Sequence, residues 1–479
     1  MNEYHRVHRL TPLLQFWSVI LALLAVLVVN LNLQALSDIA HFFSGNSQAI
    51  WGTLIGLGIF VVVCLLIWWI SGLWWRRMGY MLSDEELSLR RGLISTQLRT
   101  ARYDRTQAVD VVEPLIARIF GLAAVRVETA GGNSSSIEVA YLRKDDAEQL
   151  RRDILKRVAG EPTAPLDVNV EQQSGEGDAA EDIEQETGVE AVEEAPRASQ
   201  PQEIVSAIPT TRTLASEALR FTTFLVIALF ALFWWSPLGS SAMIAFLIGA
   251  VPAVWGRVNA SWRYNAYVDT NDSGDRVLNI AYGLADRRRQ SIRLERIHAV
   301  EVTQPLLWRM AGWYEVRVNV AGYGSATDKQ SGSTRILPVG NREQAMRVYE
   351  LVSPLTAEEI EAYAQPEGHT QPTYTSPRKA WWASPIDRAQ QAVTLLPEIA
   401  ITHDGRLSRR VAVIETSHIQ ELTYKEGPID QLLGLASVRF ELVTGPVGMM
   451  GRNLLADDAD DLLQHLRQRD LPELNAVAD

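Results

Sequence analysis

Three stretches of the chain share one pattern, and this pattern decides the fold of its soluble part. Residues 105–131 read RTQAVDVVEPLIARIFGLAAVRVETAG, residues 296–322 read RIHAVEVTQPLLWRMAGWYEVRVNVAG, and residues 418–442 read HIQELTYKEGPIDQLLGLASVRFEL. Counted from the first residue of each stretch, glycine stands at −13 and at +16, and Val-Arg stands at +20 and +21, in all three. We therefore expect one structural module in three copies.

Each copy predicts several strands followed by one helix. Apolar and polar residues alternate from position +20 onward, which is the period of a half-buried strand. The glycine at +16 ends a short apolar run and favours one helical turn with a C-cap glycine. An amphipathic helix ends each copy, and Asn341 with Gln344 predicts a capping box in the second. The module is thus a small β barrel or sandwich with a helical plug.

The pattern of arginine, proline, glycine and Val-x-Val at these positions resembles the bacterial PH-like (bPH2) domain. Three such domains with two membrane hairpins resemble the YdbT-like bacterial membrane proteins. The resemblance implies a half-open antiparallel barrel of roughly seven strands, closed at one end by the C-terminal helix. It implies no enzymatic reaction and suggests a small single-domain, YdbS-like membrane relative as a partner. The third copy departs from the pattern at His418, Pro428 and Thr444, so a ligand of the first two domains need not bind the third.

Long apolar stretches precede the first module and separate it from the second. Residues 10–37, 42–75 and 221–256 contain no charged residue. Because a helix needs about 20 apolar residues to cross a bilayer, they predict two transmembrane hairpins. Hairpin 1 covers 10–75, with spans at about 13–36 and 50–75, and hairpin 2 covers 219–257, with spans at about 219–236 and 240–257. A signal peptide is the alternative for the first span, and a re-entrant hairpin for residues 219–257.

The basic residues predict the orientation of these hairpins. Lys and Arg flank the outer ends of the spans, whereas the connecting loops 38–49 and 236–241 contain none. The positive-inside rule then predicts a multi-pass protein of the bacterial cytoplasmic (inner) membrane, with both termini and all PH-like domains cytoplasmic. Arg220 and Arg257 stand where they can snorkel to lengthen hairpin 2. The spans contain no ionisable side chain, which favours anchors over ion pathways.

The charge is concentrated in one segment. The chain has 45 Lys and Arg against 57 Asp and Glu, a net charge of −12. Residues 161–205 contain 13 of the acids and Arg197 as their only base, so the remainder is neutral. This composition predicts an acidic disordered linker over 161–207 and excludes a strongly basic nucleic-acid-binding protein. Cys64 is the only cysteine, which excludes a disulfide framework and a cysteine zinc site.

The predicted fold class combines multi-pass α-helical membrane anchors, in two helical hairpins, with three mainly-β PH-like domains. Each domain is an antiparallel half-open barrel with a C-terminal capping helix. The predicted order is hairpin 1 (10–75), PH-like domain 1 (78–160), acidic linker (161–207), hairpin 2 (219–257), PH-like domain 2 (262–355), linker (356–384) and the divergent PH-like domain 3 (385–475).

Arginines are the candidate binding residues, because neither a catalytic motif nor a set of metal or cofactor ligands is present in the sequence. Guanidinium groups bind lipid headgroups or partner carboxylates, and the alternative is that they pair within their own domain. The second role is favoured for position +21, which is arginine even in the divergent copy. Basic groups near the membrane exits can also lie on the anionic leaflet, or simply set the topology. The candidates for lipid or partner binding are Arg105, Arg118, Arg296, Arg309, Arg76, Arg77, Arg287, Arg288 and Arg289.

These features predict a membrane-anchored scaffold that is not an enzyme. Its cytoplasmic PH-like domains are expected to bind protein partners or anionic membrane lipid, within an oligomeric membrane complex. A component of a membrane transport, export or envelope-stress resistance assembly is the alternative function.

Overall fold

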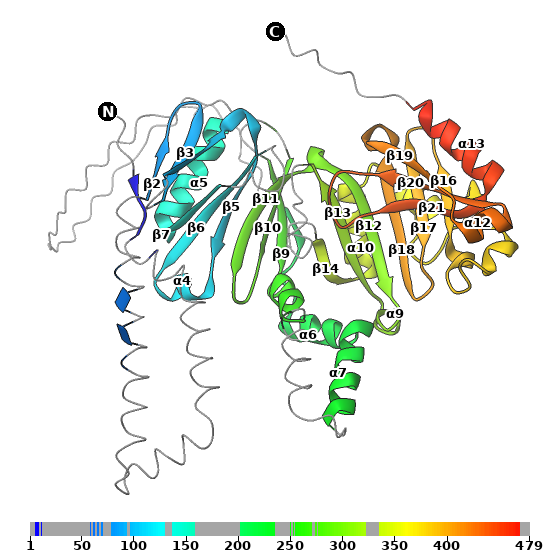
Figure 1. Cartoon of the computed structure of the whole chain (residues 1–479), viewed down its shortest axis with the longest axis horizontal. Helices are drawn as coiled ribbons and strands as arrows, with labels where there is room; N and C mark the ends of the chain where they lie inside the picture. The colour runs from blue at the N-terminus through cyan, green and yellow to red at the C-terminus, as the bar shows by residue number, and fades with distance from the viewer. Residues whose placement is uncertain are drawn as a thin grey trace, which may run out of the picture.

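Three β domains follow one another along the long axis of the molecule in the computed structural model (Figure 1). The structure describes residues 5–8, 11, 58, 61–62, 65–66, 69, 78–92, 96–129, 137–158, 202–234, 250, 252, 254–270, 274, 276–321 and 335–469. Most of predicted hairpin 1, the acidic linker up to residue 201 and the middle of predicted hairpin 2 lie outside these residues.

Each domain contributes seven antiparallel strands within the described residues, four in a first meander and three in a second. This agrees with the barrel of roughly seven strands that the resemblance implies. Domain 1 contains β1 (His5–Arg6), β2 (Gly79–Leu82), β3 (Glu86–Arg91), β4 (Gln97–Arg102), β5 (Thr106–Glu113), β6 (Leu122–Thr129) and β7 (Ile137–Arg143). Domain 2 contains β8 (Gln202–Val205), β9 (Asn265–Thr270), β10 (Arg276–Tyr282), β11 (Arg287–Arg293), β12 (Ile297–Pro305), β13 (Trp313–Val320) and β14 (Arg335–Asn341). Domain 3 contains β15 (Tyr374–Thr375), β16 (Ala392–Leu395), β17 (Ile399–Asp404), β18 (Ser408–Glu415), β19 (Glu421–Lys425), β20 (Leu435–Glu441) and β21 (Met449–Leu455).

One amphipathic helix closes each domain, as the sequence predicts. These helices are α5 (Lys144–Val158), α10 (Arg342–Val352) and α13 (Ala456–Arg467). The apolar face of α5 buries Leu150 and Ile154 against strands of domain 1. The predicted capping box is present, since the Asn341 side chain accepts from the Gln344 backbone and the Gln344 side chain accepts from the Asn341 backbone.

Two smaller elements recur in every copy. A single 3₁₀ turn precedes the fifth strand of each domain: η1 (Tyr103–Arg105), η2 (Leu294–Arg296) and η7 (Thr416–His418). A short helix follows that strand: α4 (Leu115–Ile119), α9 (Trp308–Ala311) and α12 (Pro428–Leu433).

The glycines shared by the three copies stand where the backbone adopts a positive φ. Those at +16 end the short helices in the left-handed region, with φ of 67° at Gly121, 63° at Gly312 and 59° at Gly434. This confirms the predicted C-cap. At −13, a Cβ added to Gly283 would lie 1.9 Å from the carbonyl oxygen of Asp286, so only glycine fits this turn.

The sheets run from one domain into the next. The second meander of domain 1 pairs through β5 with β11 of domain 2, and that of domain 2 pairs through β12 with β18 of domain 3. The first of these junctions has three residue pairs, from Arg287↔Glu113 to Arg289↔Val111. The second has seven, and Val411 and Val413 of β18 pack into the core of domain 2. The domains therefore form one array rather than separate units on linkers.

Both predicted linkers contribute to the folded domains. Residues 202–205, at the end of the predicted acidic linker, form edge strand β8 of domain 2, because Ile204 and Val205 pack into its core. The predicted linker 356–384 contains α11 (Ala357–Tyr363), β15 and η5 (Arg378–Trp381). Ile360 of α11 is buried in the same core.

Predicted hairpin 2 is described only at its two ends. Helix α6 (Thr210–Ala218) packs on domain 2, and α7 (Phe221–Trp234) begins the first predicted span. Among the described residues, no single helix is long and apolar enough to cross a membrane. Helices α6 and α7 up to Leu232 meet the length and composition requirement together, but with a bend of 67°. Both transmembrane hairpins therefore stay predictions.

Candidate functional site

Each short helix exposes large apolar side chains at equivalent positions. Position +14 is Ile119 in α4, Met310 in α9 and Leu432 in α12, with exposed fractions of 73%, 88% and 86%. A second exposed apolar residue stands at the start of each segment: Leu115, Leu306 and Ile429. We refer to residues 115–120, 306–311 and 428–433 as apolar tips 1, 2 and 3. Apolar groups exposed at the same place in three copies mark a contact surface.

The opposite side of tip 2 is fixed to the protein. Trp308 is fully buried, and its Nε1 donates to the carbonyl oxygen of Ser216 in α6 at 2.9 Å. The Arg220 guanidinium lies over the Trp308 ring, 4.8 Å from its centroid. One face of α9 is thus held against the segment that leads into α7, while Met310 points away.

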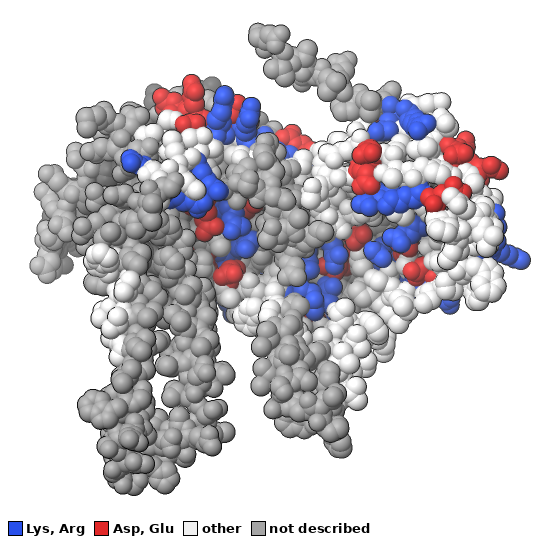
Figure 2. Space-filling model, viewed as in Figure 1, with Lys and Arg blue, Asp and Glu red and all other residues white. Residues whose placement is uncertain are grey.

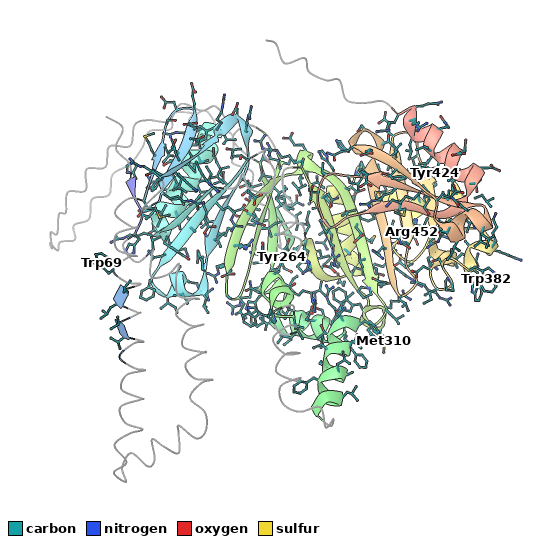
Figure 3. The ribbon with its side chains drawn as sticks, in the orientation of Figure 1. Trp69, Tyr264, Met310, Trp382, Tyr424 and Arg452 are labelled. Carbon is teal, nitrogen blue, oxygen red and sulfur yellow. The ribbon has the colours of Figure 1, made fainter. Side chains whose placement is uncertain are left out.

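Tips 1 and 2 lie on the side of the molecule from which α7 projects (Figure 1). Figure 3 places Met310 beside α7. Tip 3 lies instead at the far end of domain 3, close to Trp382, which is 72% exposed. The side chain of Lys379, in η5, donates to the carbonyl oxygen of Gly434 at 3.1 Å and holds this neighbourhood together.

Helix α7 lies on the same side of the molecule as tips 1 and 2 and is apolar along its length. Its sequence FTTFLVIALFALFW has no charged residue, and its exposed side chains include Phe221, Phe224, Ile227 and Leu232. The visible, described surface of α7 shows neither basic nor acidic residues in Figure 2. A helix that is apolar on every side is suited to a bilayer or a buried interface and not to water.

A buried network of charges connects this helical segment to domain 2. Glu315 of β13 is fully buried. Its carboxylate oxygens form ion pairs with guanidinium nitrogens of Arg220 at 2.9 Å, Arg317 at 3.0 Å and Arg335 at 3.3 Å. The Glu217 carboxylate of α6 forms ion pairs with Arg220 at 3.2 Å and with Arg257 at 2.6 Å. We refer to these six residues as the Glu–Arg network. It joins both ends of predicted hairpin 2 to the sheet of domain 2.

The network shifts the pKa values of Glu315, Arg317 and Arg335. Burial raises the pKa of Glu315, but Arg220, Arg317 and Arg335 outweigh burial and hold that pKa well below its usual range. Burial lowers the pKa of Arg335 to about 10, and Glu315 raises the pKa of Arg317. Glu315, Arg317 and Arg335 are therefore charged at neutral pH, and the Glu315 carboxylate lies where water does not reach it.

The arginines at +13 connect neighbouring domains. Arg118 Nη2 donates to the carbonyl oxygen of Leu284 at 3.1 Å, and Arg309 Nη2 donates to the carbonyl oxygen of Arg406. Leu284 and Arg406 both stand at position −12 of the following domain, so one interaction recurs at both junctions. Two of the candidate binding residues thus have a structural partner.

The remaining candidate arginines lie in different places. Arg287, Arg288 and Arg289 form the part of β11 that pairs with β5, and Arg289 Nη1 lies 2.6 Å from Glu148 Oε1. Arg105 and Arg296 end the 3₁₀ turns, at the opposite end of β5 and β12 from the apolar tips. Arg105 is exposed and Arg296 is half-buried. Arg76 and Arg77 lie outside the described residues.

The arginines at +21 brace their own domains, as expected. Arg126 lies 3.1 Å from Glu138, Arg317 lies 3.0 Å from Glu315, and Arg439 lies 3.1 Å from Glu441. Each carboxylate belongs to the same domain as its arginine, on the same or the neighbouring strand.

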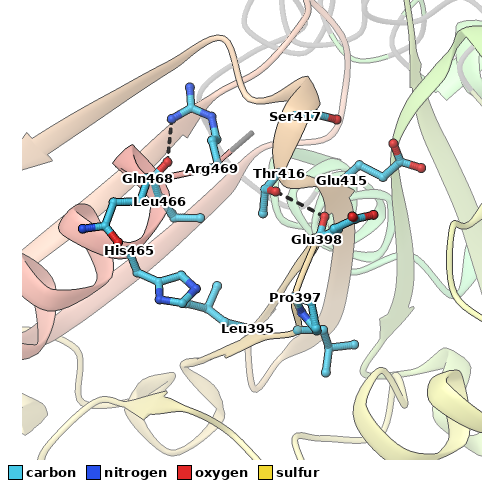
Figure 4. Close-up of a pocket in the computed structure, with 11 residues that line it drawn as sticks. Leu395, Pro397, Glu398, Glu415, Thr416, Ser417, His465, Leu466, Gln468 and Arg469 are labelled. Carbon is cyan, nitrogen blue, oxygen red and sulfur yellow. Dashed lines mark hydrogen bonds between the residues drawn. The ribbon is translucent and has the colours of Figure 1, made fainter. Parts of the chain in front are cut away.

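Domain 3 contains a pocket of about 530 Å³ between the β16–β17 turn and the end of α13 (Figure 4). Glu398, Glu415, His465 and Arg469 line it. Arg469 is already engaged, because it donates to the carbonyl oxygens of Leu466 and Ile419 at 2.7 and 2.9 Å. The described residues contain no group of three or more His, Cys, Asp or Glu that could hold a metal ion.

Sequence reasoning missed the apolar tips and both acids of the Glu–Arg network. The signal for the tips was present, since position +14 is Ile, Met or Leu directly before the cap glycine. Glu315 gave a weaker signal, as an acid within the run WYEVRVNV, whose other members are mostly apolar. Arg220 and Arg257, expected to snorkel toward the membrane surface, instead both pair with Glu217.

Known proteins resemble this chain in sequence. The family model described as "Bacterial PH domain" matches residues 19–158, 214–356 and 398–470, which is more than half of the chain. A relative, the UPF0699 transmembrane protein YdbT of Bacillus subtilis (strain 168), is 22% identical over 303 residues. That alignment covers 62% of this chain and 61% of the relative, so it spans less than two thirds of the relative's length. No solved structure matches the chain.

Proposed function

This chain belongs to the bacterial PH domain family, and we propose that it is a membrane-anchored scaffold. In this proposal the PH-like domains bind protein partners or anionic lipid on the membrane surface, as part of an oligomeric complex. The observation that carries the proposal is the side of the molecule where α7 projects below domain 2 and where Met310 and Ile119 are exposed. Large apolar side chains exposed on one side of a molecule are suited to a bilayer surface.

The proposed topology has two transmembrane hairpins with the termini and all three domains in the cytoplasm. It is supported by the uncharged stretches 10–37, 42–75 and 221–256 and by the basic residues that flank them. The relative's description as a transmembrane protein is consistent with a membrane location.

The Glu–Arg network supports a fixed distance between domain 2 and the bilayer. Arg220 stands directly before α7 and bonds to Glu217 and Glu315, so no flexible segment separates the helix from the sheet. Tip 2 then lies at the level where α7 enters the membrane. Arg309, next to Met310, brings a positive charge to the same level, where anionic headgroups attract it.

Lipid quenching in nanodiscs tests this arrangement. In a Cys64→Ser background, single cysteines replace Met310, Ile119 or Leu432, and each is labelled with an environment-sensitive fluorophore. We expect spin-labelled lipid to quench the label at 310 and at 119. Leu432 is the matched control, because tip 3 is equally exposed but lies at the far end of domain 3.

The same experiment distinguishes recognition of anionic lipid by the domains from anchoring by the transmembrane hairpins. Stronger quenching in anionic than in neutral nanodiscs supports recognition of anionic lipid by the domains. Equal quenching in both supports anchoring alone and directs the binding function to protein partners. Absence of quenching at both 310 and 119 contradicts the proposed membrane contact.

A further inference from the structure

The array of domains ends in two strand edges that are complementary to each other. At both internal junctions the fifth strand of one domain pairs with the fourth strand of the next. The equivalent strands at the two ends are β19, the fifth of domain 3, and β4, the fourth of domain 1. In the part of the chain that the structure describes, β19 pairs only with β20, and β4 pairs only with β3.

We propose that a second copy of this chain docks head to tail at these edges, so that β19 of one copy pairs antiparallel with β4 of the next. This inference rests on the proposed oligomeric scaffold and specifies its partner and contact. Strands β19 and β4 of the same copy cannot pair with each other, because domains 1 and 3 lie at opposite ends of the molecule with domain 2 between them (Figure 1). A contact between two different edges generates a closed ring or an open filament.

The two internal junctions predict the register of this contact. Residue +6 of one domain opposes residue −7 of the next in both cases, as Val111↔Arg289 and as Val302↔Val411. The same offset at the ends pairs Tyr424 with Leu98. Since a slip by one residue moves every side chain to the other face of the sheet, this register is a specific prediction.

The side chains at the two edges match in this register. Leu98 is 58% exposed although it lies within a strand, and Tyr424 would cover it. Arg99 then lies diagonally opposite Glu421, on the same face, within reach of a long side chain. Glu421 is exposed and Arg99 is half-buried, so both are accessible to a partner.

Charged residues on these edges do not argue against pairing. Edge strands are often protected from pairing with other chains by short length and charged side chains. Strand β19 has these features, since it spans five residues and has a charged residue at each end, Glu421 and Lys425. However, β11 pairs with β5 through three consecutive arginines, Arg287–Arg289, and one of them bonds across the junction to Glu148. The same array therefore already joins strands of this type.

Disulfide trapping between two differently tagged versions of the full chain tests the proposal. Both versions carry Cys64→Ser, one carries Leu98→Cys and the other Tyr424→Cys, and they are co-expressed and oxidised in membranes. Directly opposed residues in an antiparallel pair meet the distance requirement of a disulfide. We expect a covalent product that contains both tags, and none between two copies of the same version.

A register control and a charge exchange complete the experiment. Thr423→Cys in place of Tyr424→Cys points to the other face, and we expect about tenfold less product. Arg99→Glu or Glu421→Arg alone should lower the yield of the Leu98→Cys and Tyr424→Cys pair, and both together should restore it, because the attraction is re-formed with exchanged signs.

Three outcomes overturn the proposal: yields no higher than with Thr423→Cys, products between identical versions only, or exclusive capture of a different protein at both edges. Quenching at positions 310 and 119 is measured in parallel on the single-cysteine variants described above, which carry none of the trapping cysteines. Quenching without trapping rejects the head-to-tail contact alone, whereas loss of quenching rejects the membrane scaffold on which it rests.

Discussion

Glu315 carries a negative charge where no water reaches it, and three guanidinium groups make this position tolerable. Removing one partner of a buried ion pair leaves the other charges uncompensated, which costs about 3–5 kcal/mol. We therefore expect Glu315→Gln to lower the free energy of unfolding by this amount in thermal melts of the full chain. Glu295→Gln is the control, because Glu295 lies 62% exposed beside Arg293 and surface pairs contribute about 1 kcal/mol or less. Equal effects of both substitutions would contradict the assigned role.

His403 makes the stability of domain 3 dependent on pH. Its side chain is 3% exposed, and its Nε2 donates to the carbonyl oxygen of Gln365 at 3.2 Å. Burial lowers the pKa of His403 to about 4, from 6.5 in the unfolded chain. The unfolded state thus binds the proton first, so stability is fully present above pH 6.5 and declines as pH falls toward 4. The loss amounts to roughly 3 kcal/mol.

This pH dependence is measured by melting the full chain between pH 4 and 7.5. His403→Gln should reduce the slope of the profile over this range, to which His298, whose pKa burial also lowers to about 4, contributes as well. His465→Gln, at an exposed position of the same domain, is the control. A profile that keeps its slope in the His403→Gln variant would assign the dependence to other groups.

The short helices show how far sequence reasoning reaches at the scale of an element. Their position and their C-cap glycines follow from the pattern, because a left-handed residue after an apolar run has few alternatives to glycine. The exposure of Ile119, Met310 and Leu432 does not follow. One helical turn is too short for a periodicity that separates an inner from an outer face.

Two glycine substitutions distinguish backbone strain from steric conflict. Gly312 has φ of 63° with open space around it, so Gly312→Ala should cost only the strain of the left-handed region, about 1–2 kcal/mol. Gly283→Ala should cost more, because its Cβ would lie 1.9 Å from a backbone oxygen. Gly448→Ala, with neither constraint, should be nearly neutral. Thermal melts give the order, and a costly Gly448→Ala would contradict this account.

At the scale of the whole molecule, the sequence predicts three modules and their order but not their continuous sheets. Each repeat specifies its own strands through local alternation. The pairing of β12 with β18 joins residues more than a hundred positions apart and has no local signal. The Glu–Arg network is hidden for the same reason, since Glu217 and Glu315 share Arg220 as a partner only once α6 packs on domain 2.

The two junctions should differ in stability. The junction of domains 2 and 3 has seven residue pairs and a shared core, whereas that of domains 1 and 2 has three pairs. We expect hydrogen exchange of the solubilised chain to show domains 2 and 3 opening as one cooperative unit, with domain 1 opening separately at lower free energy. Simultaneous opening of β5 and β18 would contradict this difference.

The repeated junction has a consequence for how such chains arise. Because both junctions use the same strands, the same register and the same arginine contact to the next domain, a gene duplication that inserts one whole module supplies both halves of the new junction at once. Loss of one module likewise reconnects its neighbours through matching edges. The length of the array can therefore change by whole modules in evolution, without any new interface having to be selected.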